Sequence, residues 1–174
     1  MTYPSPINVI LIGMPGAGKS TVGVQLAKYL GQDFIDTDIL IQTQQEKQLQ
    51  EILDSEGHLA LRQIEEETLL GIQSKNSLIS TGGSAVYSEK AMHHLKSLGI
   101  IVYLEVSLDV LKQRVTDEDS RGIARSKGQT FDDIYQERTP LYKQYADIIY
   151  NNNQNIDIAQ LITTIEHFAT GKER

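Results

Sequence analysis

The chain has no cysteine, few prolines and no long apolar run. Without cysteine it forms neither a disulfide framework nor a cysteine-ligated zinc or iron–sulfur site, which agrees with a reducing cytoplasm. The apolar run from Ile7 to Ile12 is far too short to cross a bilayer, and no basic region of an export signal precedes it. Because linkers, repeats and low-complexity segments are also missing, we expect one cytoplasmic domain over the 174 residues, 1–174.

Positive charge is scarce as well. The chain carries 16 lysines and arginines against 23 aspartates and glutamates, a formal net charge of -7. This balance argues against a surface that binds nucleic acid non-specifically and against an anchor for anionic membranes. We therefore expect small-molecule partners and a monomer.

What the sequence does contain is a glycine-rich stretch, GMPGAGKST, directly after the run 7–12. Its spacing, Gly13-x-x-x-x-Gly18-Lys19-Ser20, is typical of a phosphate-binding loop, in which backbone N–H groups cradle phosphates, the lysine reaches the β and γ oxygens and the hydroxyl ligates Mg²⁺. The alternative is a glycine-rich turn that binds nothing. We predict a site for ATP and Mg²⁺, with a solvated Lys19 that contributes little to stability and these nucleotide-binding residues: Gly13, Gly16, Ala17, Gly18, Lys19, Ser20 and Thr21.

The surrounding pattern indicates an α/β fold with a parallel sheet wrapped by helices. A strand at 7–12 precedes the loop, and a helix follows it up to Gly31, a C-cap. In such sheets ligands bind beyond the carboxyl ends of the strands. Further strands are expected around 34–35, 78–81, 100–104 and 148–150, and helices over 49–70, 88–98, 108–115 and along the apolar stripe 158–168.

Two acids follow the second strand, in the sequence Asp36-Thr37-Asp38. If the chain is still extended there, both carboxylates lie on one face, toward the phosphate loop, where one holds the water shell of Mg²⁺ and the other accepts a hydroxyl proton. The alternative is an acidic turn that caps the next helix. The third strand ends in STGGS without an acid, which assigns the metal role to Asp36. Gly82-Gly83 lets backbone approach a substrate, unless it is an ordinary loop.

Several arginines are candidate anion ligands, although single helix arginines are usually solvated. Arg62 lies one helical turn from Glu65, which is placed to orient its guanidinium toward a carboxylate. Arg138 precedes Thr139-Pro140, a pair typical of a helix start. The acidic run 65–67 otherwise indicates a solvated helix face.

A polar, glycine-containing stretch, residues 116–129, is too long for a mere connection and is predicted to be a mobile lid. It carries Arg121 and Arg125. An arginine of this lid that arrives over the γ-phosphate would stabilise the charge of the transition state, which is a catalytic role.

From about Val9 to Tyr150 the chain resembles the shikimate kinases. The resemblance rests on GMPGAGKST, FIDTD, LRQIEEE, STGG, the lid arginine and RTPLY. It implies a three-layer fold of the nucleoside-monophosphate-kinase type, with five parallel strands in the order 2-3-1-4-5, and phosphorylation of shikimate by ATP in aromatic amino-acid biosynthesis. The roles that it implies are ATP and Mg²⁺ binding for Lys19 and Ser20, the metal shell for Asp36, the acceptor hydroxyl for Asp38, shikimate binding for Arg62, Gly82, Gly83 and Arg138, the lid for Arg121 and adenine packing for Arg114.

Two departures from that family affect the parts of the chain that would close over the substrate. Ser84 stands where the family usually has a third glycine, and Gly122-Ile123-Ala124 follows Arg121 in place of Pro-Leu-Leu, which should loosen the lid. A related kinase for another hydroxy acid, such as homoserine or gluconate, therefore stays open. A nucleotide switch is disfavoured because the D-x-x-G match at 54–57 falls within a helical region, and a catalytically inactive regulator because Lys19 and Asp38 are present.

Overall fold

The computed structural model describes residues 7–115, 122–154 and 156–171. Five parallel strands form one sheet in the order β2-β3-β1-β4-β5, which confirms the predicted fold class and strand order. The central strands are buried on both faces and are therefore continuous apolar runs rather than alternating ones. The strands are β1 (Asn8–Ile12), β2 (Asp33–Asp36), β3 (Ser77–Ser80), β4 (Gly99–Glu105) and β5 (Ile148–Asn151).

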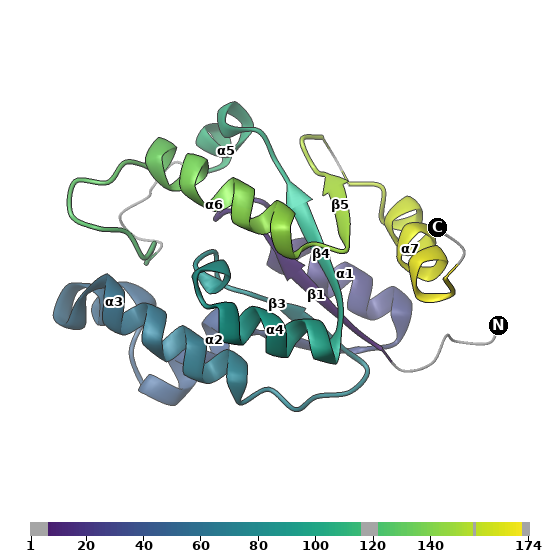
Figure 1. Ribbon diagram of the computed structural model, residues 1–174, viewed down its shortest axis with the longest axis horizontal. Coiled ribbons are helices and arrows are strands. Elements are labelled where there is room, and N and C mark those ends of the chain that lie inside the picture. The colour runs from purple at the N-terminus through teal and green to yellow at the C-terminus, as the bar shows by residue number, and fades with distance from the viewer. Residues whose placement is uncertain (1–6, 116–121, 155, 172–174) are drawn as a thin grey trace.

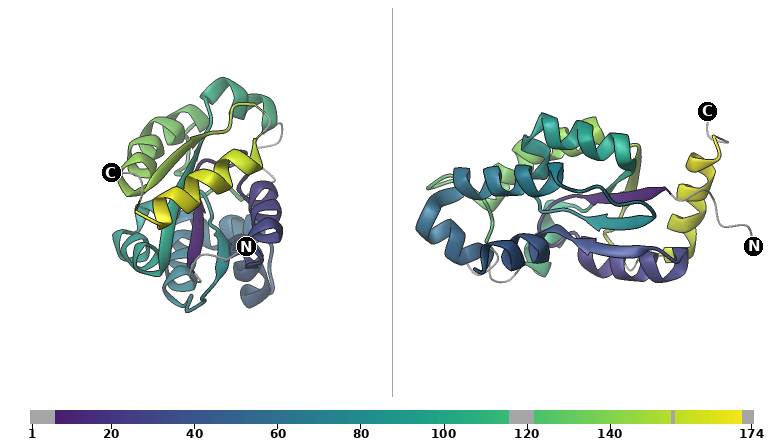
Figure 2. Two further views of the ribbon diagram at one scale, coloured as in Figure 1. Left: turned by 90° about the vertical axis from the view of Figure 1, so that its right-hand side faces the viewer. Right: turned by 90° about the horizontal axis from the view of Figure 1, so that it is seen from below.

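Helices cover both faces of this sheet, so the domain has three layers. In Figure 1 α4 and α6 lie in front of the sheet and α1 behind it, and Figure 2 shows the same layers edge-on. Within the described part of the chain, no helix is both long and apolar enough to span a membrane. The helices are α1 (Lys19–Leu30), α2 (Thr37–Gln45), α3 (Leu49–Leu70), the 3-10 turn η1 (Ala85–Tyr87), α4 (Glu89–Leu98), α5 (Leu108–Arg114), α6 (Phe131–Tyr145) and α7 (Ile158–Ala169).

Two apolar clusters hold these layers together. The main core joins the sheet to the inner faces of the helices and includes Leu161 and Ile165 of the predicted α7 stripe. A smaller cluster of Ile41, Ile52, Leu61 and Ala124 joins α2 and α3 to the segment 122–124. The second cluster therefore fixes the walls of the region beyond the carboxyl end of β1.

One predicted helix start is wrong. Helix α6 begins at Phe131, and Thr130 and Asp133 form its capping box, so Pro140 and Arg138 lie inside the helix rather than at its start. The proline removes the N–H that would bond the Gln136 carbonyl, but both residues are exposed, so that carbonyl is accessible to solvent. The helix persists because its inward face is buried at helical spacing, through Phe131, Ile134, Arg138 and Tyr142.

Candidate active site

The phosphate-binding loop lies between β1 and α1, as predicted. Gly18 adopts a left-handed conformation, with φ of 90°, directly before the helix, and within the described residues no side chain caps the first N–H groups of α1. Gly16 also has a positive φ, 83°, and a Cβ there would lie 2.4 Å from Val115 Cγ2. The uncapped N–H groups at the start of a helix are a ready anion site, so the loop keeps free donors for phosphate.

Lys19 is buried, not solvated. Only 9% of its surface is exposed, and its Nζ donates to the carbonyl oxygens of Gly13 at 2.8 Å and Met14 at 3.0 Å. Burial lowers the pKa of Lys19 to about 8, against the opposing effect of Asp38, Asp36 and Glu65. The prediction that this side chain contributes little to stability is therefore unsupported by its surroundings.

The expectation that the chain stays extended through both acids is wrong, because β2 ends at Asp36 and α2 begins at Thr37. Asp36 ends β2 and caps α2, because its Oδ1 accepts from the backbone N–H groups of Asp38 at 3.0 Å and Ile39 at 3.4 Å. The alternative of a helix-capping acidic turn thus describes Asp36 correctly. Its second oxygen, Oδ2, accepts the hydroxyl of Ser20 at 2.6 Å. One carboxylate therefore caps a helix and contacts the phosphate loop at the same time.

Asp38 lies in the first turn of α2 and faces the glycines that follow β3. A Cβ on Gly82 would lie 2.9 Å from Asp38 Oδ1 and 2.1 Å from Glu65 Oε1, and one on Gly83 would lie 2.8 Å from Pro15 Cδ. Protein side chains therefore crowd both glycines, and the approach of their backbone to a substrate stays a prediction. Withdrawal from water raises the pKa of Asp38, and the nearby Lys19 partly offsets this.

The phosphate loop, the start of α2 and the glycines after β3 line a cavity of about 70 Å³ beyond the carboxyl ends of the strands. It brings together a cation from the phosphate loop, two carboxyl groups, a guanidinium and a glycine-walled edge. Its polar and glycine lining consists of Lys19, Asp38, Glu65, Gly82, Gly83, Ser84, Gly122 and Arg138.

Arg138 is the most deeply buried cation of this cavity, with 1% of its surface exposed. Its Nη2 donates to the Ala124 carbonyl at 2.6 Å and its Nε to the Tyr87 hydroxyl at 3.2 Å. Its Nη1 has no hydrogen-bond partner among the described residues. One edge of the guanidinium is therefore held by the protein while another nitrogen stays available.

Arg62 does not line that cavity. It lines a neighbouring one of about 460 Å³, and its Cζ lies 3.7 Å from the centre of the Tyr87 ring. Its Nε is shielded from solvent without a partner among the described residues. The expected pairing with Glu65 is absent in this part of the chain, because Glu65 accepts a hydrogen bond from the Ser84 hydroxyl.

Glu65 also contradicts the prediction of a solvated acidic face, since only 4% of its surface is exposed. Burial raises the pKa of Glu65 to about 7, while the Ser84 hydrogen bond opposes that rise. The sequence held a signal for this burial, because Leu61, Glu65 and Leu69 follow one another at intervals of four residues on the inner face of α3. No pattern in the sequence marked Tyr87, and Ser84 was marked only as a departure from the family pattern.

The lid prediction falls partly outside the described residues: 116–121, with Arg121, are not among them. Gly122 has a φ of 59°, a Cβ there would lie 2.5 Å from Leu49 Cβ, and its N–H donates to Gln50 Oε1 at 3.1 Å. The residues 122–124 are buried against α3. Gly122 therefore permits a close contact, and its surroundings do not indicate the expected loosening.

Arg114 ends α5 beside the phosphate loop. Its Nη2 donates to the Asn152 carbonyl at 2.8 Å, and a Cβ on Gly16 would lie 3.9 Å from its own Cβ. The predicted contact with adenine stays a prediction, for which this position is suitable.

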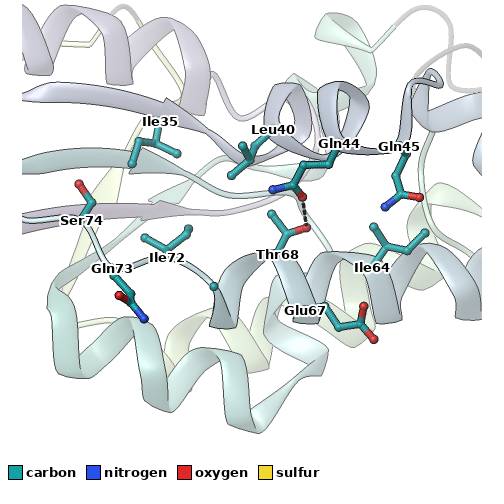
Figure 3. Close-up of a pocket in the computed structure, with 11 residues that line it drawn as sticks. Ile35, Leu40, Gln44, Gln45, Ile64, Glu67, Thr68, Ile72, Gln73 and Ser74 are labelled. Carbon is teal, nitrogen blue, oxygen red and sulfur yellow. Dashed lines mark hydrogen bonds between the residues drawn. The ribbon is translucent and has the colours of Figure 1, made fainter.

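A further cavity, of about 310 Å³, lies between α2 and the carboxyl-terminal half of α3 (Figure 3). Thr68 donates a hydrogen bond to Gln44 across it at 3.3 Å. Among the described residues, none of the predicted site residues lines it, and Glu67 is the one charged residue of its lining. An anionic ligand therefore fits the cavities near the phosphate loop better.

The strand order and the glycine-rich loop before α1 are those of the P-loop fold found in small-molecule kinases. The family model described as shikimate kinase matches residues 15–168. The shikimate kinase of Haemophilus influenzae strain PittEE is 35% identical over 167 residues, which cover 92% of this chain and 93% of the relative. That of Clostridium botulinum strain Okra is 35% identical over 159 residues, with 89% and 94% covered. The chain therefore belongs to the shikimate kinase family, and the resemblance read from its motifs is confirmed.

Solved structures agree with this assignment. Shikimate kinase from Acinetobacter baumannii, in complex with shikimate, has a TM-score of 0.84 and 30% identity, and the match covers 99% of this chain and 96% of that one. A deoxyadenosine kinase from M. mycoides matches with a TM-score of 0.60 at 14% identity, which supports the fold alone. The family is one of phosphotransferases that act on a hydroxyl group with ATP as a substrate.

Proposed function

We propose that this protein transfers the γ-phosphoryl group of ATP to a hydroxyl of shikimate. The observation that carries the proposal is the shared lining of one cavity by Lys19, Asp38 and Arg138. A cation beside phosphate, a carboxylate beside a hydroxyl and a guanidinium beside a carboxylate are the three contacts that this reaction requires. The family of the chain and its relatives' names support the same acceptor.

ATP is proposed to bind with its phosphates along Gly13–Thr21. The free N–H groups at the start of α1 and the ammonium of Lys19 both favour anionic oxygens there. Arg114 is proposed to lie against adenine. Arg121, outside the described residues, is proposed to approach the γ-phosphate on the strength of the family resemblance.

Mg²⁺ is proposed to bind at Ser20 and Asp36. Their oxygens are 2.6 Å apart and form the hydroxyl and carboxylate donor set that this hard cation prefers. Among the described residues there is no cluster of three His, Cys, Asp or Glu side chains that would hold a metal, so phosphate and water would provide its other ligands. When bound, the ion neutralises charge on the β- and γ-phosphate oxygens.

Asp38 is proposed to accept the proton of the acceptor hydroxyl. Asp36 already uses one oxygen for the start of α2 and the other for Ser20, whereas Asp38 lines the cavity and faces Lys19. The raised pKa of Asp38 suits a base, because proton transfer is most efficient when the pKa approaches the working pH.

The acceptor's carboxylate is proposed to bind between two arginines, at Nη1 of Arg138 and Nε of Arg62. Neither nitrogen has a hydrogen-bond partner in the described chain. The cavity of about 70 Å³ is smaller than ordinary ligand sites, which span roughly 300–1,000 Å³. Binding therefore has to enlarge it, and the paired Ser84 and Glu65 line both it and the larger cavity that holds Arg62. Joining the two cavities at this pair would admit the acid.

The direct test is ADP release from Mg²⁺-ATP with shikimate, and then with homoserine, gluconate, a neutral polyol and a nucleoside monophosphate. We expect shikimate-dependent turnover that Lys19→Ala abolishes. Turnover of another hydroxy acid without shikimate would replace the acceptor but keep the carboxylate site. Preference for the polyol or the nucleotide would refute the carboxylate site itself.

A further inference from the structure

Tyr87 contacts both arginines of the proposed carboxylate site. It ends η1, the short turn that follows the glycines after β3 and packs against α3 and α6. The Arg62 guanidinium from α3 stacks on its ring at 3.7 Å, and Arg138 Nε from α6 donates to its hydroxyl at 3.2 Å. Arg138 Cζ is also 5.2 Å from the same ring centre. One half-buried side chain thus lies between two cations from different helices.

This arrangement answers a physical problem of the site. Two guanidinium groups that converge on one carboxylate repel each other, and each rotates freely unless something holds its plane. The face of an aromatic ring and the lone pairs of a hydroxyl are both electron-rich, so Tyr87 attracts both cations. Stacking also defines the plane of Arg62, and with it the direction of its N–H donors.

Other contacts of Arg62 do not replace this one. In the described part of the chain its Nε has no partner, and Glu65, one turn further along α3, is engaged by Ser84. Arg138 is held at Nη2 by the Ala124 carbonyl, so the Tyr87 hydroxyl provides its second anchor. The orientation of Arg62 therefore depends on the ring, and that of Arg138 partly on the hydroxyl.

We propose that Tyr87 is a positioning residue for recognition of the acceptor's carboxylate, its ring acting through Arg62 and its hydroxyl through Arg138. This inference rests on the proposed function. It predicts that Tyr87 sets the KM for the acid, because it orients the ligands of the carboxylate, and leaves the KM for ATP unchanged, because it does not line the phosphate loop.

Two variants separate the hydroxyl from the ring. Tyr87→Phe removes only the hydroxyl and should raise the KM for shikimate about 3- to 10-fold. Tyr87→Leu also removes the stacking surface and should raise it roughly 30-fold or more. In both, kcat and the KM for ATP should stay near the wild-type values. Tyr29→Leu, at a residue 68% exposed on α1, makes the same chemical change elsewhere and should change neither KM.

The same Tyr87 variants made in an Arg62→Ala protein test whether the ring acts through Arg62. In Arg62→Ala protein the ring keeps only the more distant Arg138 guanidinium, so the difference in KM for shikimate between Tyr87→Phe and Tyr87→Leu should become much smaller than in the wild-type background. An undiminished difference there, or an unchanged KM for shikimate in single Tyr87→Leu, would overturn the inference. Equal rises in both KM values would indicate a merely structural role and also overturn it.

Two other causes of a changed KM are tested separately: a variant that fails to fold, and an acceptor other than shikimate. If Tyr87→Leu fails to fold, as judged by circular dichroism and the melting temperature, Tyr87→Phe decides, and an unchanged KM in that variant refutes the proposal. If wild-type protein turns over another carboxylic acid, the same comparison is made with that acid. Wild-type protein that uses no carboxylic acid at all refutes the proposed function, and Tyr87's role with it.

Discussion

Replacement of Arg138 by lysine tests the carboxylate site most directly. Arg138 is buried on α6, with Nη2 on the Ala124 carbonyl at 2.6 Å, Nε on Tyr87 at 3.2 Å and Nη1 without a partner in the described chain. Lysine has one terminal nitrogen in place of three. It keeps the charge but cannot hold two protein acceptors and present a planar pair of donors to a carboxylate.

The magnitude follows from the bonds that are lost. A hydrogen bond from a charged donor contributes about 1.5–3 kcal/mol, so loss of one to the ligand lowers kcat/KM for the acid roughly 10- to 100-fold. The Ala124 carbonyl is left without its donor, which costs about 1–3 kcal/mol of stability. For a domain of this size each kcal/mol lowers the melting temperature by about 2–4 °C.

The assay is steady-state ADP release with either substrate varied, alongside thermal melts. We expect Arg138→Lys to lose kcat/KM for shikimate while the KM for ATP stays within about twofold of wild type. Arg114→Lys is the matched control, because Arg114 lies beside the phosphate loop and should change the KM for ATP and not that for the acid. Unchanged kcat/KM for shikimate in Arg138→Lys, or an equal loss for both substrates, would refute the reasoning.

Three further predictions concern ionisable groups near the phosphate loop. As pH rises through about 8, kcat/KM for ATP should fall, because free enzyme loses the proton of Lys19; a flat profile contradicts this. Asp38→Asn should lower kcat by about 10²-fold or more with nucleotide affinity kept, and weaker ATP binding at normal kcat would reverse the roles of Asp36 and Asp38. The free energy of unfolding, from urea titrations, should fall as pH rises from 4.5 to about 7, because folded Glu65 holds its proton more tightly than the unfolded chain. Glu65→Gln should reduce this slope, and exposed Glu67→Gln should keep it.

Much of the fold was predictable because its signals are local. Buried parallel strands are short apolar runs, and the phosphate loop fixes one strand before it and one helix after it. The helix end at Gly31 was correct because a left-handed C-cap favours glycine, and Gly31 has a φ of 65° there. These features depend on neighbouring residues, so one sequence is sufficient to find them.

The errors arose where two local signals competed. Thr139-Pro140 is typical of a helix start, yet Thr130 and Asp133 form a capping box nine residues earlier, and the buried face of α6 runs through both regions. Asp36-Thr37-Asp38 fits both an extended pair and a cap, and the cap prevailed because Asp36 satisfies two free N–H groups of α2. In each place burial and hydrogen-bond satisfaction decided between patterns of similar strength.

The run 65–67 shows what kind of information was missing. Three consecutive glutamates read as one solvated face, but successive helix residues point about 100° apart, so one of them has to follow the buried interval from Leu61 to Leu69. That one is Glu65. Its burial is tolerated because Ser84, from another element and 19 residues away, donates to it. The helical period identifies the buried glutamate, but only the tertiary structure identifies its partner. Ser84 is one of the two positions where the sequence led us to expect a departure from the family pattern, and the sequence did not show what it contacts.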